Sequence, residues 1–243
     1  MSDLRAAFTN NLSALILACG FVLAAIIGSW TFYSVRSFDN ALQVTGSARS
    51  SITSDTVKWT AQFTRTVGSD QLKDGYDQMR KDAAAVAAFL KTNAIDEKNA
   101  TVSPVFMDMD YSTNDGMPRR QILRQNVEIR STDVAGITKV AKNVDALISK
   151  GVLFSTQSLE YGYSKLPDLR VELLTDAMKD ARARATNIAG SDGHGVGSLK
   201  SASIGVVQVL APGSTSVEDY GAYDTSSIDK EVMVTVRATF TLR

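Results

Sequence analysis

A long uncharged segment near the N-terminus constrains this chain more than any other feature. Residues 6–35 contain no charged side chain, and residues 12–35 read LSALILACGFVLAAIIGSWTFYSV. A helix over residues 12–35 would be about 36 Å long, which exceeds the roughly 30 Å hydrocarbon core of a bilayer. We therefore expect a transmembrane anchor at 12–35, with residues 1–11 as a short tail and the rest of the chain folded on one side of the membrane.

The segment is more typical of an uncleaved anchor than of a secretory signal. A signal peptide has a basic start and a shorter apolar core, whereas Arg5 is offset here by Asp3 and the apolar run is longer. Cys19 ends an Ile-Leu-Ala-Cys run that resembles a lipoprotein processing box. Apolar residues continue after this cysteine, so a buried structural cysteine is favoured over lipidation.

Two further patterns lie inside the predicted anchor. Gly20, Ala24 and Gly28 recur every four residues and form one small-residue stripe, where a second helix could approach closely. Trp30 and Tyr33 stand near the C-terminal end, as aromatic residues do at a membrane interface. We predict helix packing at the stripe and interfacial positions for the two aromatic side chains.

Composition excludes some classes of function. The chain has 26 Lys and Arg against 26 Asp and Glu, so it lacks the basic surplus of nucleic-acid-binding proteins. The single cysteine lies in the apolar run, so no disulfide can form within the chain. We expect no nucleic-acid partner and no thiol chemistry in the region after the anchor.

The region after residue 40 alternates between strand-like and helix-like patterns. The fold class predicted is α+β, with mostly antiparallel strands and about three helices packed on one face. Strands are expected as a pair within 42–67 and at 101–111, 121–130, 152–164, 199–210 and 230–242, and helices at 69–93, 132–150 and 167–190. Ser69 or Asp70 and Thr132 are the predicted N-caps of the first two helices. The buried face predicted for the third helix comprises Val171, Leu174, Met178, Ala181, Ala185 and Ile188.

No pattern of catalytic or metal-ligating residues emerges from the sequence. The single histidine, His194, lies in GSDGHGVGS, and one histidine cannot build a His-rich metal site. The glycines at 193, 195 and 197 follow a helix and precede a strand, which is the reverse of a phosphate-binding loop. We expect a flexible connection there, no catalytic residue, no cofactor and no bound metal.

Two sets of charged residues could be interpreted as ligand-binding sites. Asp108, Asp110 and Asp115 resemble part of a calcium loop, but strand alternation places the first two on one solvated face and no Glu follows at the twelfth position. Arg182 and Arg184 lie about 200° apart on their helix and cannot form one anion site. We expect these arginines to pair with Asp180 or with a neighbouring subunit.

Five segments, taken in order, span about 42–243: QVTGSAR, LKTNAI, KGVLFST, PDLRVELLTDAMKDARARATNIA and SSIDKEVMVTVRATFTL. Together they resemble the SIMPL-domain family of bacterial periplasmic and outer-membrane proteins. The resemblance implies a domain rich in βαβ units, export from the cytoplasm, and assembly into ring-like or hollow homo-oligomers. It supplies no catalytic residues. This chain differs from many relatives in carrying what looks like an uncleaved anchor.

The sequence therefore predicts a SIMPL-like exported domain at 42–243 on a single-pass anchor in the bacterial inner membrane. Residues 1–11 would lie in the cytoplasm and the domain in the periplasm, with the bilayer and further copies of the chain as partners. The expected role is structural or protective against oxidative stress in the cell envelope, without enzymatic activity. The alternative is a ligand-binding or enzymatic domain whose loops 112–120 and 211–227 frame a pocket.

Overall fold

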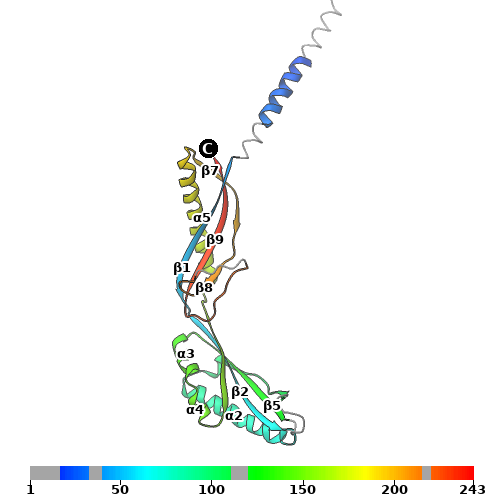
Figure 1. The fold of residues 1–243 in the computed structure, drawn as a ribbon, viewed down its shortest axis with the longest axis vertical. Helices are drawn as coiled ribbons and strands as arrows, with labels where there is room; N and C mark the ends of the chain where they lie inside the picture. Colours follow the sequence, from blue (N-terminus) through cyan, green and yellow to red (C-terminus); the bar gives the residue numbers. More distant parts are fainter. Residues whose placement is uncertain (1–16, 33–39, 111–119, 215–219) are drawn as a thin grey trace, which may run out of the picture. The chain divides into compact units, whose positions relative to one another are not determined.

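The computed structural model describes residues 17–32, 40–110, 120–214 and 220–243 (Figure 1). The fold is α+β with antiparallel sheets, as predicted. The chain divides into two compact units, and each is made of segments distant in sequence. Unit 1 comprises Met1–Ala48, Leu174–Gly205 and Thr235–Arg243, and unit 2 comprises Arg49–Leu173 and Val206–Val234.

Unit 2 is built on a five-stranded sheet with the order β3-β5-β2-β6, in which β4 also pairs with β5. Its strands are β2 (Thr56–Gly68), β3 (Ala100–Val102), β4 (Phe106–Met109), β5 (Arg120–Ser131) and β6 (Leu153–Gly162). All pairings are antiparallel. The odd-numbered residues at the start of β2 are buried and the even-numbered ones are not, so one face of the sheet meets the core and the other stays open.

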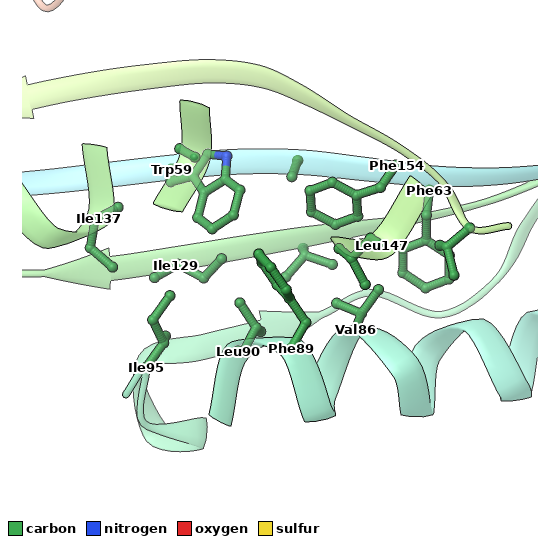
Figure 2. Close-up of a cluster of buried hydrophobic side chains, with 14 of the residues drawn as sticks. Trp59, Phe63, Val86, Phe89, Leu90, Ile95, Ile129, Ile137, Leu147 and Phe154 are labelled. Atoms are coloured by element: carbon green, nitrogen blue, oxygen red, sulfur yellow. The ribbon is translucent and has the colours of Figure 1, made fainter. Parts of the chain in front are cut away.

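Helices cover the core face of this sheet. They are α2 (Leu72–Thr92), the short 3-10 helix η1 (Glu97–Asn99), α3 (Val134–Lys142) and α4 (Asp145–Ile148). Trp59 and Phe154 meet edge to face, with ring centroids 5.9 Å apart, which is a favourable aromatic geometry. Side chains from the strands and from the helices form one cluster (Figure 2): Trp59, Phe63, Val86, Phe89, Leu90, Ile129, Ile137, Leu147 and Phe154.

A charged pair lies against this apolar core. The Arg65 side chain of β2 donates to both carboxylate oxygens of Asp82 on α2, at 2.6 and 2.9 Å, and also to the carbonyl oxygen of Gly151 at 2.7 Å. Asp82 is only 3% exposed. The hydrogen bond to Asp82 raises the pKa of Arg65 and outweighs the opposing effect of burial. The pair ties the strand, the helix and the loop after α4 together.

A second, four-stranded sheet has the order β1-β9-β7, with β8 also paired to β9. Its strands are β1 (Ala41–Thr53), β7 (Val196–Ile204), β8 (Gln208–Leu210) and β9 (Asp229–Leu242). Helix α5 comprises Leu166–Ser191, and its part in unit 1, from Leu174 on, lies along one face of this sheet (Figure 1). The buried residues between them are Val44, Ala181, Ala185, Ala238 and Phe240.

The helix and sheet of unit 1 approach closely because their facing residues are small. A Cβ atom added at Gly46 of β1 would overlap the carbonyl oxygen of Ala177 and the backbone nitrogen of Ala181. Ala177, Ala181, Ala185 and Ala189 are all buried along α5. The prediction for this helix was therefore right at Ala181 and Ala185 but wrong at Val171 and Ile188, which are exposed.

Other predicted elements are interrupted. The helix expected at 132–150 is two helices, because α3 ends at Lys142 and its C-cap Asn143 leaves the helical conformation, with φ −132° and ψ 83°. The strand expected at 101–111 breaks around Pro104, which has no N–H to donate. The strand expected at 199–210 breaks after β7, where the Gly205 N–H bonds to the Thr235 carbonyl oxygen at 2.9 Å.

Both predicted N-caps are wrong by one or two residues. The N-cap of α2 is Gln71, without a side-chain capping bond. The N-cap of α3 is Asp133, whose carboxylate accepts from the Gly136 N–H at 2.9 Å. The Asp133 carboxylate is the more favourable partner because it carries a charge at the positive end of the helix dipole.

Candidate functional site

The N-terminal apolar segment is helical where the structure describes it, at residues 17–32. Its large apolar side chains are exposed by between 58% and 75%: Leu17, Phe21, Val22, Leu23, Ile26, Ile27, Trp30 and Phe32. Gly20 and Gly28 face open space, since no described atom lies within 4 Å of where their Cβ atoms would stand. Ala24 belongs to the same helix and is also exposed. The packing role of this stripe stays a prediction.

The described part of the predicted anchor is shorter than the predicted span of 12–35, and Tyr33 lies outside the described residues. Within the described ranges, no helix is both long enough and apolar enough to cross a membrane.

The clearest concave surface is a cleft in unit 2, which we call the polar cleft, with a volume of about 600 Å³. It lies where β2 begins and where β5 and β6 end, and the segment around Tyr223 completes it. Its lining residues are Thr56, Val57, Lys58, Asn99, Arg130, Ser131, Thr132, Glu160, Tyr161, Gly162, Tyr223 and Thr225.

Strand register explains why charged side chains gather there. Lys58 of β2 pairs with Arg130 of β5 on one side and with Glu160 of β6 on the other. Asn99 directly precedes Ala100, the residue of β3 that pairs with Ile129. Arg130, Lys58 and Glu160 therefore form one row across three neighbouring strands, on the open face of the sheet, and Asn99, the last residue of η1, also lines the cleft.

The charges in and beside the cleft are paired. Lys58 Nζ lies 3.4 Å from the carboxylate of Glu160. Arg130 Nε donates to Glu128 Oε1 at 2.7 Å. The cleft consequently presents both hydrogen-bond donors and acceptors without a surplus of either charge.

Two tyrosines line the cleft in different ways. Tyr161 is buried, and its hydroxyl group lies 3.0 Å from Thr138 Oγ1 of α3. Tyr223 is 52% exposed. The backbone N–H of Tyr161 donates to the Thr225 carbonyl oxygen at 2.7 Å, which fixes the segment of Tyr223 and Thr225 against the end of β6.

A buried lysine, Lys230, holds the segment of Tyr223 and Thr225 through a hydrogen bond to the backbone of Asp224. Lys230 of β9 is 1% exposed in its side chain, and its Nζ donates to the Asp224 carbonyl oxygen at 2.5 Å. Burial lowers the pKa of Lys230, and the Asp224 carboxylate only partly opposes this. Burial by itself would raise the pKa of Asp224, but hydrogen bonds from Ser227 and Ser226 and the charge of Lys230 lower it to about 2.

Sequence reasoning missed the polar cleft and its support, although one signal was present. Lys230 lies two and four residues before Val232 and Val234 on the same strand, so strand alternation already placed it on their buried face. Of the two loops predicted to frame the alternative pocket, 112–120 and 211–227, only the second contributes residues to the cleft. Tyr223 and Thr225 line the cleft, Arg120 does not, and residues 112–119 lie outside the described part of the chain.

The acidic and histidine candidates occupy ordinary surface positions. Asp108 pairs with Arg124 at 3.0 Å, and Asp115 lies outside the described residues. His194 is in the loop before β7, 3.8 Å from Asp192. Among the described residues, no group of three or more His, Cys, Asp or Glu side chains could hold a metal ion.

The two arginines of α5 do not form a common site, as predicted. Arg184 pairs with Asp180 at 2.8 Å, and Arg182 stacks over the ring of Phe240, with 5.7 Å between its guanidinium carbon and the ring centroid. The pairing of Arg184 with Asp180 was expected, whereas the cation–π contact of Arg182 was not.

The chain was compared with known protein families. The model of a family described as "SIMPL: Protein of unknown function (DUF541)" matches residues 42–240. No curated protein matches the chain.

Proposed function

Because the chain belongs to the SIMPL family, we propose that it is a membrane-anchored cell-envelope protein that assembles into a ring-like or hollow homo-oligomer. Residues 12–35 anchor it in the bacterial inner membrane, and the SIMPL domain lies in the periplasm. Its role is structural or stress-protective, and no enzymatic step is part of the proposal.

The observation that supports the proposed membrane anchor is the exposed apolar surface of the helix at 17–32. Each of its large apolar side chains exposes more than half of its surface. Such a surface is unfavourable in water, at roughly 25 cal/mol for every Å² of apolar area, and favourable in lipid. The absence of charge over residues 6–35 extends the same property into the flanking sequence.

Self-assembly is supported by an apolar edge on the five-stranded sheet. Val102 of β3 and Phe106, Met107 and Met109 of β4 are each about half exposed, and we call them the β4 edge patch. In the described part of the chain, β4 pairs only with β5, which leaves its other edge open. An open strand edge with apolar side chains is a site of association.

The anchor is tested by extracting membranes that contain the full chain with alkaline carbonate. We expect the protein to stay in the membrane pellet. Leu23→Arg should release it, because an arginine at the centre of a span costs about 3 kcal/mol, whereas Leu23→Ala should remain bound. Release of the unaltered chain by carbonate would overturn the anchor.

The edge patch is tested by sedimentation velocity of the detergent-solubilised chain. Met107→Lys places a charge on the patch and should shift the protein toward smaller species, whereas Met107→Leu should not. An unchanged distribution for Met107→Lys would remove the β4 edge patch from the assembly interface.

A further inference from the structure

We propose that the polar cleft of unit 2 is a binding site for a neutral polyhydroxylated ligand, that is, a short stretch of glycan. This goes beyond the proposed anchoring and assembly and does not depend on either.

The size and position of the cleft suit such a ligand. About 600 Å³ lies in the range of small-molecule sites and accommodates about two sugar rings. The floor is the row of Arg130, Lys58 and Glu160 across three strands, whose backbone is fixed by ladder pairing on both sides of β2. A site built on strands is preorganised, so little ordering entropy opposes binding.

The charge balance selects a neutral ligand. Lys58 is compensated by Glu160 and Arg130 by Glu128, at 3.4 and 2.7 Å. An anion at either basic group would be repelled by the neighbouring carboxylate, and a cation at either carboxylate would be repelled by the neighbouring basic group. A ligand with hydroxyl groups can instead accept from the basic groups and donate to the carboxylates, and both ion pairs stay intact.

The remaining polar groups of the cleft have the same dual character. Thr56, Ser131 and Thr132 offer hydroxyl groups, each of which can donate and accept. Asn99 offers an amide with both a donor and an acceptor. This mixture matches the dense, alternating donors and acceptors of a sugar ring.

Tyr223 provides the apolar element that a sugar needs as well. Tyr223 is 52% exposed and lines the cleft, and its segment is held by the Tyr161 and Lys230 hydrogen bonds. One face of a pyranose ring carries mainly C–H groups, which stack against an aromatic ring. A rigid, half-exposed tyrosine beside polar side chains is therefore the anchor residue of the site.

The open face continues the cleft with a second polar row. Thr60 of β2 pairs with Glu128 and Ser158, and Thr101 pairs with Glu128 from the other side. A ligand longer than two rings can therefore extend along the strands across hydroxyl-bearing side chains.

The test is isothermal titration calorimetry of the full chain, in a detergent without a sugar headgroup. The probes are cellobiose and N,N′-diacetylchitobiose as neutral ligands and inorganic phosphate as an anion. We expect at least one disaccharide to bind, and phosphate to bind more weakly or not at all.

Substitutions locate the binding. Tyr223→Ala should weaken disaccharide binding about tenfold, while Tyr223→Phe keeps the ring and should bind as the unaltered chain does. Tyr220→Ala is the matched control, because Tyr220 is exposed and does not line the cleft. Arg130→Ala changes a side chain that is 73% exposed, so it tests the polar contacts without risk to folding.

Three results would overturn the site: no heat with either disaccharide, tighter binding of phosphate than of both, or disaccharide binding that Tyr223→Ala and Arg130→Ala both leave unchanged. Loss of disaccharide binding leaves carbonate extraction and sedimentation unaffected, so this failure is distinct from failure of the proposed function.

Discussion

The ion pair between Arg65 and Asp82 allows a quantitative test of how unit 2 is held together. Asp82 is 3% exposed and Arg65 24% exposed, and two hydrogen bonds of 2.6 and 2.9 Å join them. Removing one partner from a buried pair costs about 3 to 5 kcal/mol, because the other charge is left uncompensated. Arg65 reaches some solvent, so we place Asp82→Leu at the lower end, at about 3 kcal/mol.

The reverse change should cost about as much or more. Arg65→Met strips Asp82 of its bidentate partner and leaves Gln78, at 3.4 Å, as a weak donor. It also frees the Gly151 carbonyl oxygen. The double variant Arg65→Met/Asp82→Leu removes both charges and fills the same volume, so its stability should lie within about 1 kcal/mol of the unaltered chain.

Urea unfolding followed by tryptophan fluorescence measures this cycle. Trp59 is fully buried in the unit 2 core, and all variants carry Trp30→Phe so that only Trp59 reports. The predicted coupling between the two sites is several kcal/mol. Two single variants that each cost less than about 1 kcal/mol, or a double variant that costs their sum, would refute the reasoning.

Three further predictions concern packing and protonation. Gly46→Val should destabilise the protein by about 3 kcal/mol in urea unfolding, because its side chain overlaps the backbone of Ala177, whereas Gly190→Ala, which meets open space, should not. The pKa of Asp224 is about 2 in the folded protein against an ordinary 3.8, so stability present above about pH 4 should fall by about 2 kcal/mol as the pH drops to about 2. Asp224→Asn should flatten this part of the unfolding free energy against pH, and an equally steep curve would contradict the assignment. Because burial lowers the pKa of Lys230, the unaltered chain should gain stability as the pH rises toward 10.5, and Lys230→Met should lose that gain in the same alkaline titration of unfolding free energy.

Local patterns identified most strands and helices, because their signals lie within a few residues. The pair of strands expected within 42–67 is present as β1 and β2, and in β2 the alternating residues Val57, Trp59, Ala61 and Phe63 are all buried.

The helix face of α5 was predicted poorly for a physical reason. Hydrophobicity favoured the large residues Val171 and Ile188, yet the sheet meets the smaller Ala177 and Ala189. The face of α5 that is buried is the one that approaches Gly46 of β1 closely, and Gly46 lies more than a hundred residues before α5 in the sequence. The spacing of apolar residues and the size of side chains along one helix cannot reveal a glycine on a distant strand.

The strand order and the cleft also depend on distant contacts. β1 and β2 are separated by two residues but belong to different sheets, which local patterns do not distinguish. The polar cleft combines residues from around 57, 99, 131, 161 and 224. Each of these residues alone is an ordinary strand end or loop position, and only the register brings them together.

The mass of the full chain in detergent, measured by light scattering with the detergent contribution subtracted, tests the proposed assembly most directly. We predict a homogeneous particle whose protein mass is a whole-number multiple of 26.1 kDa, corresponding to two or more copies. A particle with a single copy of 26.1 kDa at all concentrations would contradict it.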